Sequence, residues 1–93
     1  MREIRFDDIV TAVRDACIRA NTVLPDDLCG AIRSAAETEE SPVGRAILGD
    51  LEENFTFAAQ RGLPICQDTG MAVVFLELGQ EAHITGGLLE DAV

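Results

Sequence analysis

The sequence contains no lysine, and no positively charged residue follows Arg61. Its seven cations are all arginines and face 17 acidic residues, which gives a formal net charge of −10. Nucleic acids and anionic membrane surfaces are bound through basic footprints, so this balance argues against both as partners. The sequence also lacks any run near the roughly 20 consecutive apolar residues that a membrane-spanning helix needs.

Paired cysteines are absent as well. The three cysteines make an odd number, none belongs to a Cys-x-x-Cys pair, and there is a single histidine. We therefore expect neither a disulfide framework nor a zinc site that the chain completes by itself. The N-terminus carries charged residues where a secretory signal has an apolar core, so a cytoplasmic location is expected.

What is present is one small domain that is rich in helix. Apolar residues recur at spacings of three and four, which predicts helices over about 7–21, 26–39 and 42–60. Asp7 is the expected N-cap of the first helix. Ser41 followed by proline starts the third, and Arg61-Gly62 ends it. The predicted helical faces carry the following residues: Phe6, Val10, Val13, Cys17 and Ala20; Leu28, Ile32 and Ala35 or Ala36; Val43, Ile47, Leu51, Phe55 and Ala58.

After residue 61 the pattern changes to that of strands. Residues 71–78 are almost continuously apolar, with β-branched and aromatic side chains, which predicts a strand buried on both faces. A short second strand is expected over 82–84, and the opening of a further helix over 88–93. Helices followed by strands define an α+β fold, with about 7–61 helical and 62–87 forming a loop and strands. Because the last pattern stops without a cap, we expect residues 1–93 to be a fragment, either one domain or one piece of a longer protein.

The segment Pro64–Gly70 carries the chemistry-bearing side chains. A thiol, an amide and a carboxylate stand side by side at Cys66, Gln67 and Asp68, between a helix and the predicted strand. Cys17 and Cys29 fall on or beside helical faces, where a free cysteine packs as a small hydrophobe. For Cys66, packing in the core and chemistry remain open. A redox thiol would need an electropositive setting, which the acidic surroundings do not supply.

The triplet Asp68-Thr69-Gly70 matches the short motif of aspartic proteases, in which two carboxylates share a proton. In those proteases a strand leads into the triplet and the fold is nearly all β. Here about sixty residues with helical patterning precede it, so the protease interpretation is set aside.

The longer stretch from Pro64 to Gln80, followed by His83-Ile84-Thr85-Gly86-Gly87, closely resembles the class I fumarate hydratase and tartrate dehydratase family. The match is to the N-terminal part of the iron–sulfur-dependent α-type domain, and Ser41–Arg45 and Asn54 resemble its helical lead-in. The resemblance covers most of the 93 residues. It implies a hydro-lyase that adds water to, or removes it from, a four-carbon dicarboxylic acid such as fumarate, malate or tartrate.

The resemblance also implies roles for the loop. Cys66 would be one of three ligands to a [4Fe–4S] cluster, whose fourth iron stays open to act as a Lewis acid on the substrate. Gln67 would bind substrate. Asp68 would contact substrate or orient a catalytic group, although a turn residue that caps its own loop is the plainer interpretation. His83 is either a hydrogen-bonded structural group or an acid or base, and Gly86-Gly87 either approaches a ligand or forms a turn.

The other two cluster ligands that the resemblance implies lie further along the α-type domain, because Cys17 and Cys29 precede the loop and fall on helical faces. A dicarboxylate also requires cations, and residues 62–93 contain no lysine or arginine. The resemblance therefore implies as partners the remainder of the α-type domain and a β-type domain or subunit, in a homo-oligomer. We expect the 93 residues alone to be inactive. The alternative is an interaction or assembly module that kept the fold without the enzyme, with its apolar strand pairing with a partner or with itself.

Overall fold

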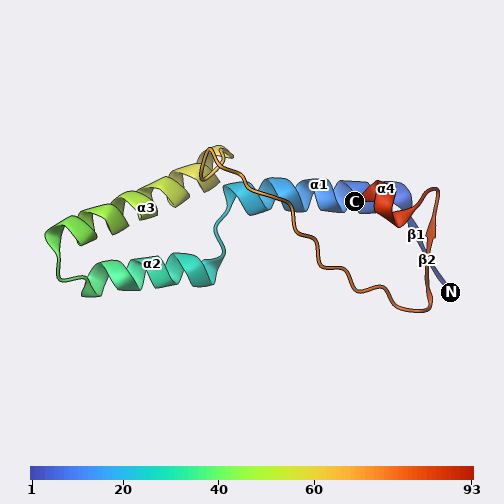
Figure 1. The fold of residues 1–93 in the computed structure, drawn as a ribbon, viewed down its shortest axis with the longest axis horizontal. Coiled ribbons are helices and arrows are strands. Elements are labelled where there is room, and N and C mark those ends of the chain that lie inside the picture. Colours follow the sequence, from blue (N-terminus) through green and yellow to red (C-terminus); the bar gives the residue numbers. More distant parts are fainter. The chain divides into compact units, whose positions relative to one another are not determined.

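The computed structural model describes all residues from Met1 to Val93. The elements follow in the order β1 (Arg2–Arg5), α1 (Phe6–Thr22), α2 (Asp26–Thr38), α3 (Pro42–Arg61), β2 (Ala82–Thr85) and α4 (Leu89–Ala92), and Figure 1 labels them along the chain. Three long helices and one small sheet confirm the helix-rich α+β class. The chain divides into two compact units, one made of Met1–Ile18 and Gly70–Val93 and the other of Arg19–Thr69.

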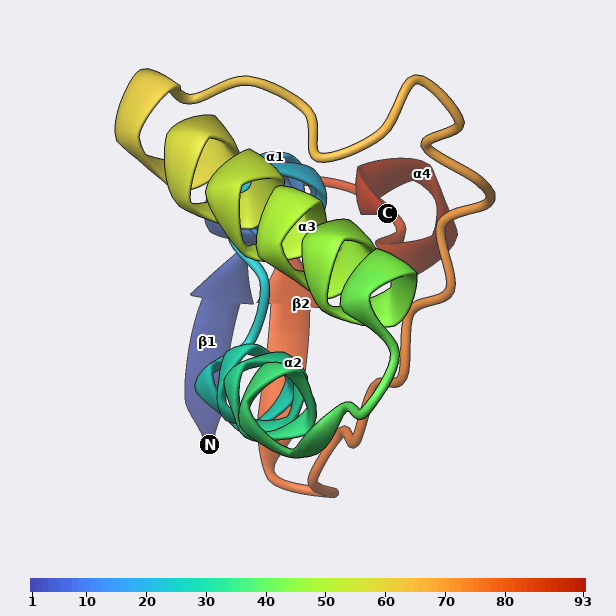
Figure 2. The ribbon, with the colours of Figure 1, turned by 90° about the vertical axis from the view of Figure 1, so that its left-hand side faces the viewer.

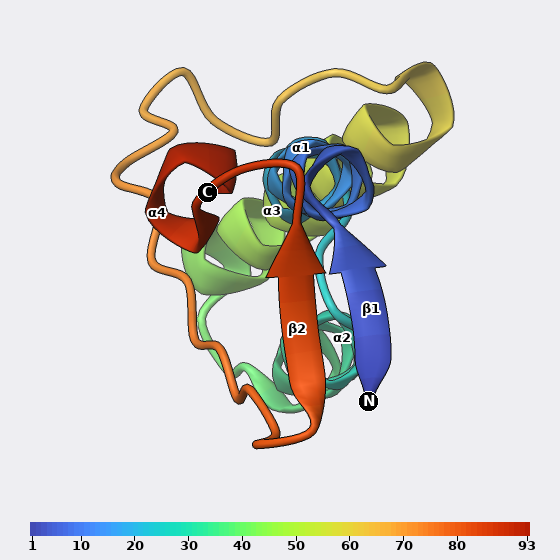
Figure 3. The same ribbon diagram turned by 90° about the vertical axis from the view of Figure 1, so that its right-hand side faces the viewer.

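The first unit contains a two-stranded parallel sheet. β1 pairs with β2 from Arg2 opposite Ala82 to Arg5 opposite Thr85, and Figure 3 shows the two strands side by side. The backbone N–H of Arg2 also donates to the Glu81 carbonyl at 2.8 Å. The sequence patterning anticipated β2 but not β1, whose four residues lack the apolar alternation of a typical strand.

The turn after β2 is built on two glycines. Gly86 has a φ of +91°, which favours glycine, and a Cβ on Gly87 would lie 2.5 Å from the Phe6 ring. The close approach at this turn is therefore to an aromatic side chain of α1, which accounts for Gly87 without any ligand.

The predicted strand over 71–78 is wrong. These residues have no regular secondary structure and form no hydrogen bonds, and their apolar side chains are exposed rather than buried. Phe75 is 93% exposed and Met71 90%. A strand exists only when a neighbour accepts and donates its backbone hydrogen bonds, and β1 and β2 pair only with each other. An apolar composition is thus insufficient to define a strand here.

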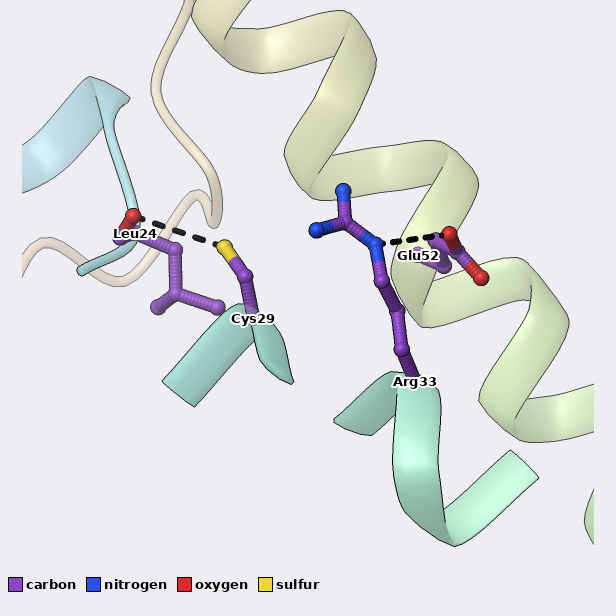
Figure 4. A network of polar contacts seen from close by, with 4 residues as sticks. All are labelled: Leu24, Cys29, Arg33 and Glu52. Atoms are coloured by element: carbon purple, nitrogen blue, oxygen red, sulfur yellow. Dashed lines mark hydrogen bonds and ion pairs between the residues drawn. The ribbon is translucent and has the colours of Figure 1, made fainter. Parts of the chain in front are cut away.

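In the second unit, α2 packs against α3. Figure 2 shows this helix pair in the foreground. Its buried residues are Cys29 on α2 and Phe55 and Ala58 on α3. Arg33 on α2 donates to Glu52 on α3 at 2.9 Å, as Figure 4 shows, and its guanidinium lies 5.4 Å from the centre of the Phe55 ring. One arginine thus joins the two helices by an ion pair and a cation–π contact.

The helix boundaries follow the predictions closely, with one correction. Ser41 caps α3 through its hydroxyl, which accepts from the Gly44 N–H at 3.3 Å. Gly62 ends α3 in the left-handed conformation. Asp7, however, is not an N-cap, because α1 already begins at Phe6 and Asp7 lies in its first turn.

The predicted face of α3 is only partly correct. Phe55 and Ala58 are buried, but Val43, Ile47 and Leu51 are 69%, 55% and 45% exposed. The helix is apolar on more than one side, and a helix buries against a single partner only the stripe that faces it.

Candidate functional site

The Cys66 loop, defined as residues 62–69, follows α3 directly. Gly62 has a φ of +64°, and both its N–H and that of Leu63 donate to the Ala58 carbonyl. These two hydrogen bonds satisfy a carbonyl in the last turn of α3. The chain can reverse direction at this point because glycine enters the left-handed conformation at little cost. Pro64 then fixes its own φ and favours an extended conformation at Leu63.

Both polar backbone groups of Ile65 are held by helices. Its N–H donates to the carbonyl of Asn21 in α1 at 2.8 Å. Its carbonyl accepts from the side-chain amide of Asn54 in α3 at 2.9 Å. All these residues belong to the unit Arg19–Thr69, so the residue before Cys66 is anchored within a single unit.

The Cys66 side chain is exposed and points to a polar neighbour. Its thiol donates to the Gln67 side-chain oxygen at 3.7 Å. Gln67 and Asp68 are exposed as well. The alternative of core packing for Cys66 is therefore wrong, and all three functional groups of the loop are accessible to a ligand.

The other cysteines differ from Cys66. Cys29 is buried, and its thiol donates to the Leu24 carbonyl at 3.5 Å (Figure 4), which confirms its assignment as a packed thiol. Cys17 is half-buried on α1. No group of three or more histidine, cysteine or acidic residues is placed to hold a metal ion. Within this chain, Cys66 fits a metal cluster as a single ligand only.

His83 and Asp68 belong to different units. His83 lies on β2, opposite Glu3 of β1, and its side chain is exposed. Asp68 lies in the Cys66 loop and takes part in an interaction of its own.

The electrostatics of the loop disfavour an anion. From Gly62 to Val93 there are five acidic residues and no lysine or arginine. The nearest cation along the chain, Arg61, lies over the Phe57 ring at 5.4 Å. A dicarboxylate bound at Cys66 therefore needs cations that residues 62–93 do not supply.

A hollow of about 420 Å³ lies in the first unit, lined by one charged residue, Glu90, and by apolar residues. The apolar residues are Val74, Leu76, Leu88, Leu89 and Val93. It contains no residue of the Cys66 loop and no cation, so it has neither the thiol nor the charge that the loop chemistry would use.

Asn54 and Asn21 are the residues around the loop whose positioning contacts the sequence patterns do not predict. Asparagine is a poor helix former because its side chain competes for backbone hydrogen bonds. Its place in the middle of α3, a helix of 20 residues, is the one sequence signal that could have pointed to a structural role.

The family model of fumarate hydratase (Fumerase) matches residues 10–93. The putative L(+)-tartrate dehydratase subunit alpha of Methanocaldococcus jannaschii is 35% identical over 77 residues, which are 83% of this chain and 26% of that protein. The L(+)-tartrate dehydratase subunit alpha of Escherichia coli K12 is 29% identical over 68 residues, which are 73% of this chain and 22% of that protein.

This chain belongs to the fumarate hydratase (Fumerase) family. It spans about a quarter of the length of the curated relatives that it matches. No solved structure matches it. No helix of the chain is both long enough and apolar enough to cross a membrane.

Proposed function

We propose that this chain is the N-terminal part of a hydro-lyase that adds water to, or removes it from, a four-carbon dicarboxylic acid such as fumarate, malate or tartrate. The observation that supports the proposal most is the family match over residues 10–93, which includes an exposed Cys66 in an anchored loop. Two relatives are named as tartrate dehydratase alpha subunits, which supports a β-type domain or subunit as partner. A homo-oligomer in the cytoplasm is part of the same proposal.

Cys66 would hold one corner of a [4Fe–4S] cluster as its thiolate. The cluster, when bound, supplies an open iron that stabilises the developing charge on a leaving hydroxide. Cys66 suits this role because its sulfur is exposed and has only a weak thiol–amide contact with Gln67. Its other two cysteine ligands and the arginines that pair with substrate carboxylates would come from the remainder of the protein.

Gln67 and Asp68 would work beside the cluster. The Gln67 amide can turn from the Cys66 thiol and donate a hydrogen bond to a substrate oxygen. Asp68 would orient a neighbouring catalytic group or a substrate hydroxyl, because a carboxylate repels the carboxylates of a dicarboxylate substrate. The 93 residues by themselves would be inactive, and measurable hydration of fumarate by this chain after anaerobic loading with iron and sulfide would contradict that.

The experiment that tests the proposal is replacement of one ligand in the full-length protein. Cys66→Ser should abolish hydration of fumarate and dehydration of tartrate, and should lower the iron and sulfide bound per chain, because an alcohol is a poor ligand for iron in a cluster. Cys29→Ala is the matched control, since Cys29 is buried and packed, and it should retain the iron. Equal iron in the wild type and Cys66→Ser would refute the assignment of Cys66.

A second candidate function is an interaction module without catalysis. The exposed apolar segment 71–78, whose backbone forms no hydrogen bonds, favours it. The gene beyond Val93 distinguishes the two: two further cysteines and a group of arginines support the enzyme, whereas a stop codon at that point supports the module.

A further inference from the structure

The peptide unit that leads into Cys66 is oriented by a side chain from another element. The carbonyl of Ile65 and the N–H of Cys66 belong to one planar peptide unit. That carbonyl accepts from the Asn54 side chain at 2.9 Å, across 11 residues of sequence. A hydrogen bond that fixes the direction of the Ile65 carbonyl therefore also orients the Cys66 N–H, which belongs to the same plane and leads directly to the Cα that carries the thiol.

The other contacts of Ile65 restrict the same peptide unit further. Its N–H is held by the Asn21 carbonyl at 2.8 Å, and Pro64 on its other side has a fixed φ. Asn21 acts through its backbone, which any residue could supply. Asn54 acts through its side chain, so its chemical identity decides whether the carbonyl is held.

We infer that Asn54 is a positioning residue that holds Cys66 in place through the Ile65 carbonyl. An exposed asparagine without a side-chain contact would only weaken the middle of α3, because asparagine favours helix less than alanine or leucine does. The Asn54 amide instead donates a hydrogen bond to the loop. The part of the inference that concerns the cluster rests on the proposed function, whereas the part that concerns the loop stands on the geometry alone.

The test uses the full-length protein and the substitution Asn54→Asp. The carboxylate keeps the shape of the side chain but cannot donate to the Ile65 carbonyl. Hydrogen exchange in the peptide that spans residues 63–66 should accelerate by about fivefold, the effect of losing one ordinary hydrogen bond. The rate at which a chelator removes iron should rise by a similar factor relative to the wild type.

Two further variants separate positioning from charge and from loss of folding. Gln60→Glu makes the same change from amide to carboxylate on α3, at an exposed residue for which no side-chain hydrogen bond is seen, and should leave both rates unchanged. Asn54→Gln keeps an amide donor, so hydrogen exchange at residues 63–66 should be slower in this variant than in Asn54→Asp. Equal exchange in these two Asn54 variants would contradict a role for the donor.

Unchanged exchange at residues 63–66 in Asn54→Asp would overturn the inference. Faster exchange with an unchanged rate of iron release would overturn the part that concerns Cys66, because Asn54 would then hold the loop without any consequence for a cluster ligand. A wild-type protein that binds no iron after anaerobic loading would contradict the proposed function instead. Exchange at residues 63–66 would in that case still decide whether Asn54 holds the loop.

Discussion

Cys29 and Cys66 show how strongly the surroundings of a cysteine decide what its thiol can do. Cys29 is 9% exposed and donates to the Leu24 carbonyl, whereas Cys66 is exposed next to the polar side chain of Gln67. Both thiols act as weak hydrogen-bond donors to oxygen. The difference in accessibility, rather than in bonding, separates a packing residue from a residue that an external metal could reach.

This contrast predicts the order in which the thiols react. Iodoacetamide added to the native chain should label Cys66 before Cys29, by a factor of about ten or more, since a buried thiol reacts only after local opening. Mass spectrometry of the labelled peptides over time gives the rates. In concentrated urea the two rates should converge, and preferential labelling of Cys29 in the native chain would show that the Cys66 loop is covered.

Among the elements, the three long helices and the short strand β2 were predictable, whereas β1 and the state of segment 71–78 were not. Helices α1, α2 and α3 are defined by local signals, such as the Ser41 cap and the Gly62 terminus, and their observed ends lie within one residue of the predictions. Segment 71–78 has the composition of a strand, but strand formation depends on a distant partner that composition does not encode. β1 was missed for the converse reason. Its residues lack the apolar alternation of a strand, and its strand conformation depends on the backbone hydrogen bonds that β2 provides.

The candidate site divides in the same way. Cys66, Gln67 and Asp68 could be found from the sequence because they are adjacent and stand where a helix ends. The Asn54 contact could not be derived from any local pattern, since it joins α3 to Ile65 through a turn whose path depends on Gly62. The sequence showed that Asn54 resembles the family, but not what its side chain contacts.

The left-handed turn at Gly62, which ends α3, is expected to contribute to stability. Gly62→Ala should destabilise the unit Arg19–Thr69 by about 1 kcal/mol, because alanine resists the left-handed conformation that φ of +64° requires. Gly49→Ala is the matched control. Gly49 lies within α3, and a Cβ added there would meet no atom within 4 Å, so the substitution should stabilise the helix by up to about 1 kcal/mol. Urea unfolding followed by circular dichroism at 222 nm measures both.

A destabilising effect of both substitutions would contradict this account, since it would mean that α3 tolerates no added methyl group. Equal stabilisation by both would show that the helix does not end in the left-handed turn at Gly62. Either result would also remove the geometric basis for the path from α3 to Ile65.

For the whole molecule, the amount of exposed apolar surface outweighs the core. Only Cys29, Phe55, Ala58 and Ala92 are buried, and no large side chain is completely enclosed. Apart from Met1, the most exposed apolar side chains lie in segment 71–78, where Met71, Val73 and Phe75 are between 71% and 93% exposed. Exposed apolar side chains that follow one another in a segment favour association, and backbone groups without hydrogen bonds remain available to pair with another strand.

The 93-residue chain is therefore expected to self-associate through segment 71–78. Sedimentation velocity over about a hundredfold range of concentration should show a rising mean mass, with stronger association in high salt, since salt screens the repulsion between chains of net charge −10. Phe75→Ser should shift the association to higher concentration. Val43→Ser, which also removes a 69% exposed apolar side chain but lies on α3, should have a much smaller effect. A monomer at every concentration, or equal effects of the two substitutions, would show that segment 71–78 is not the surface through which this chain associates.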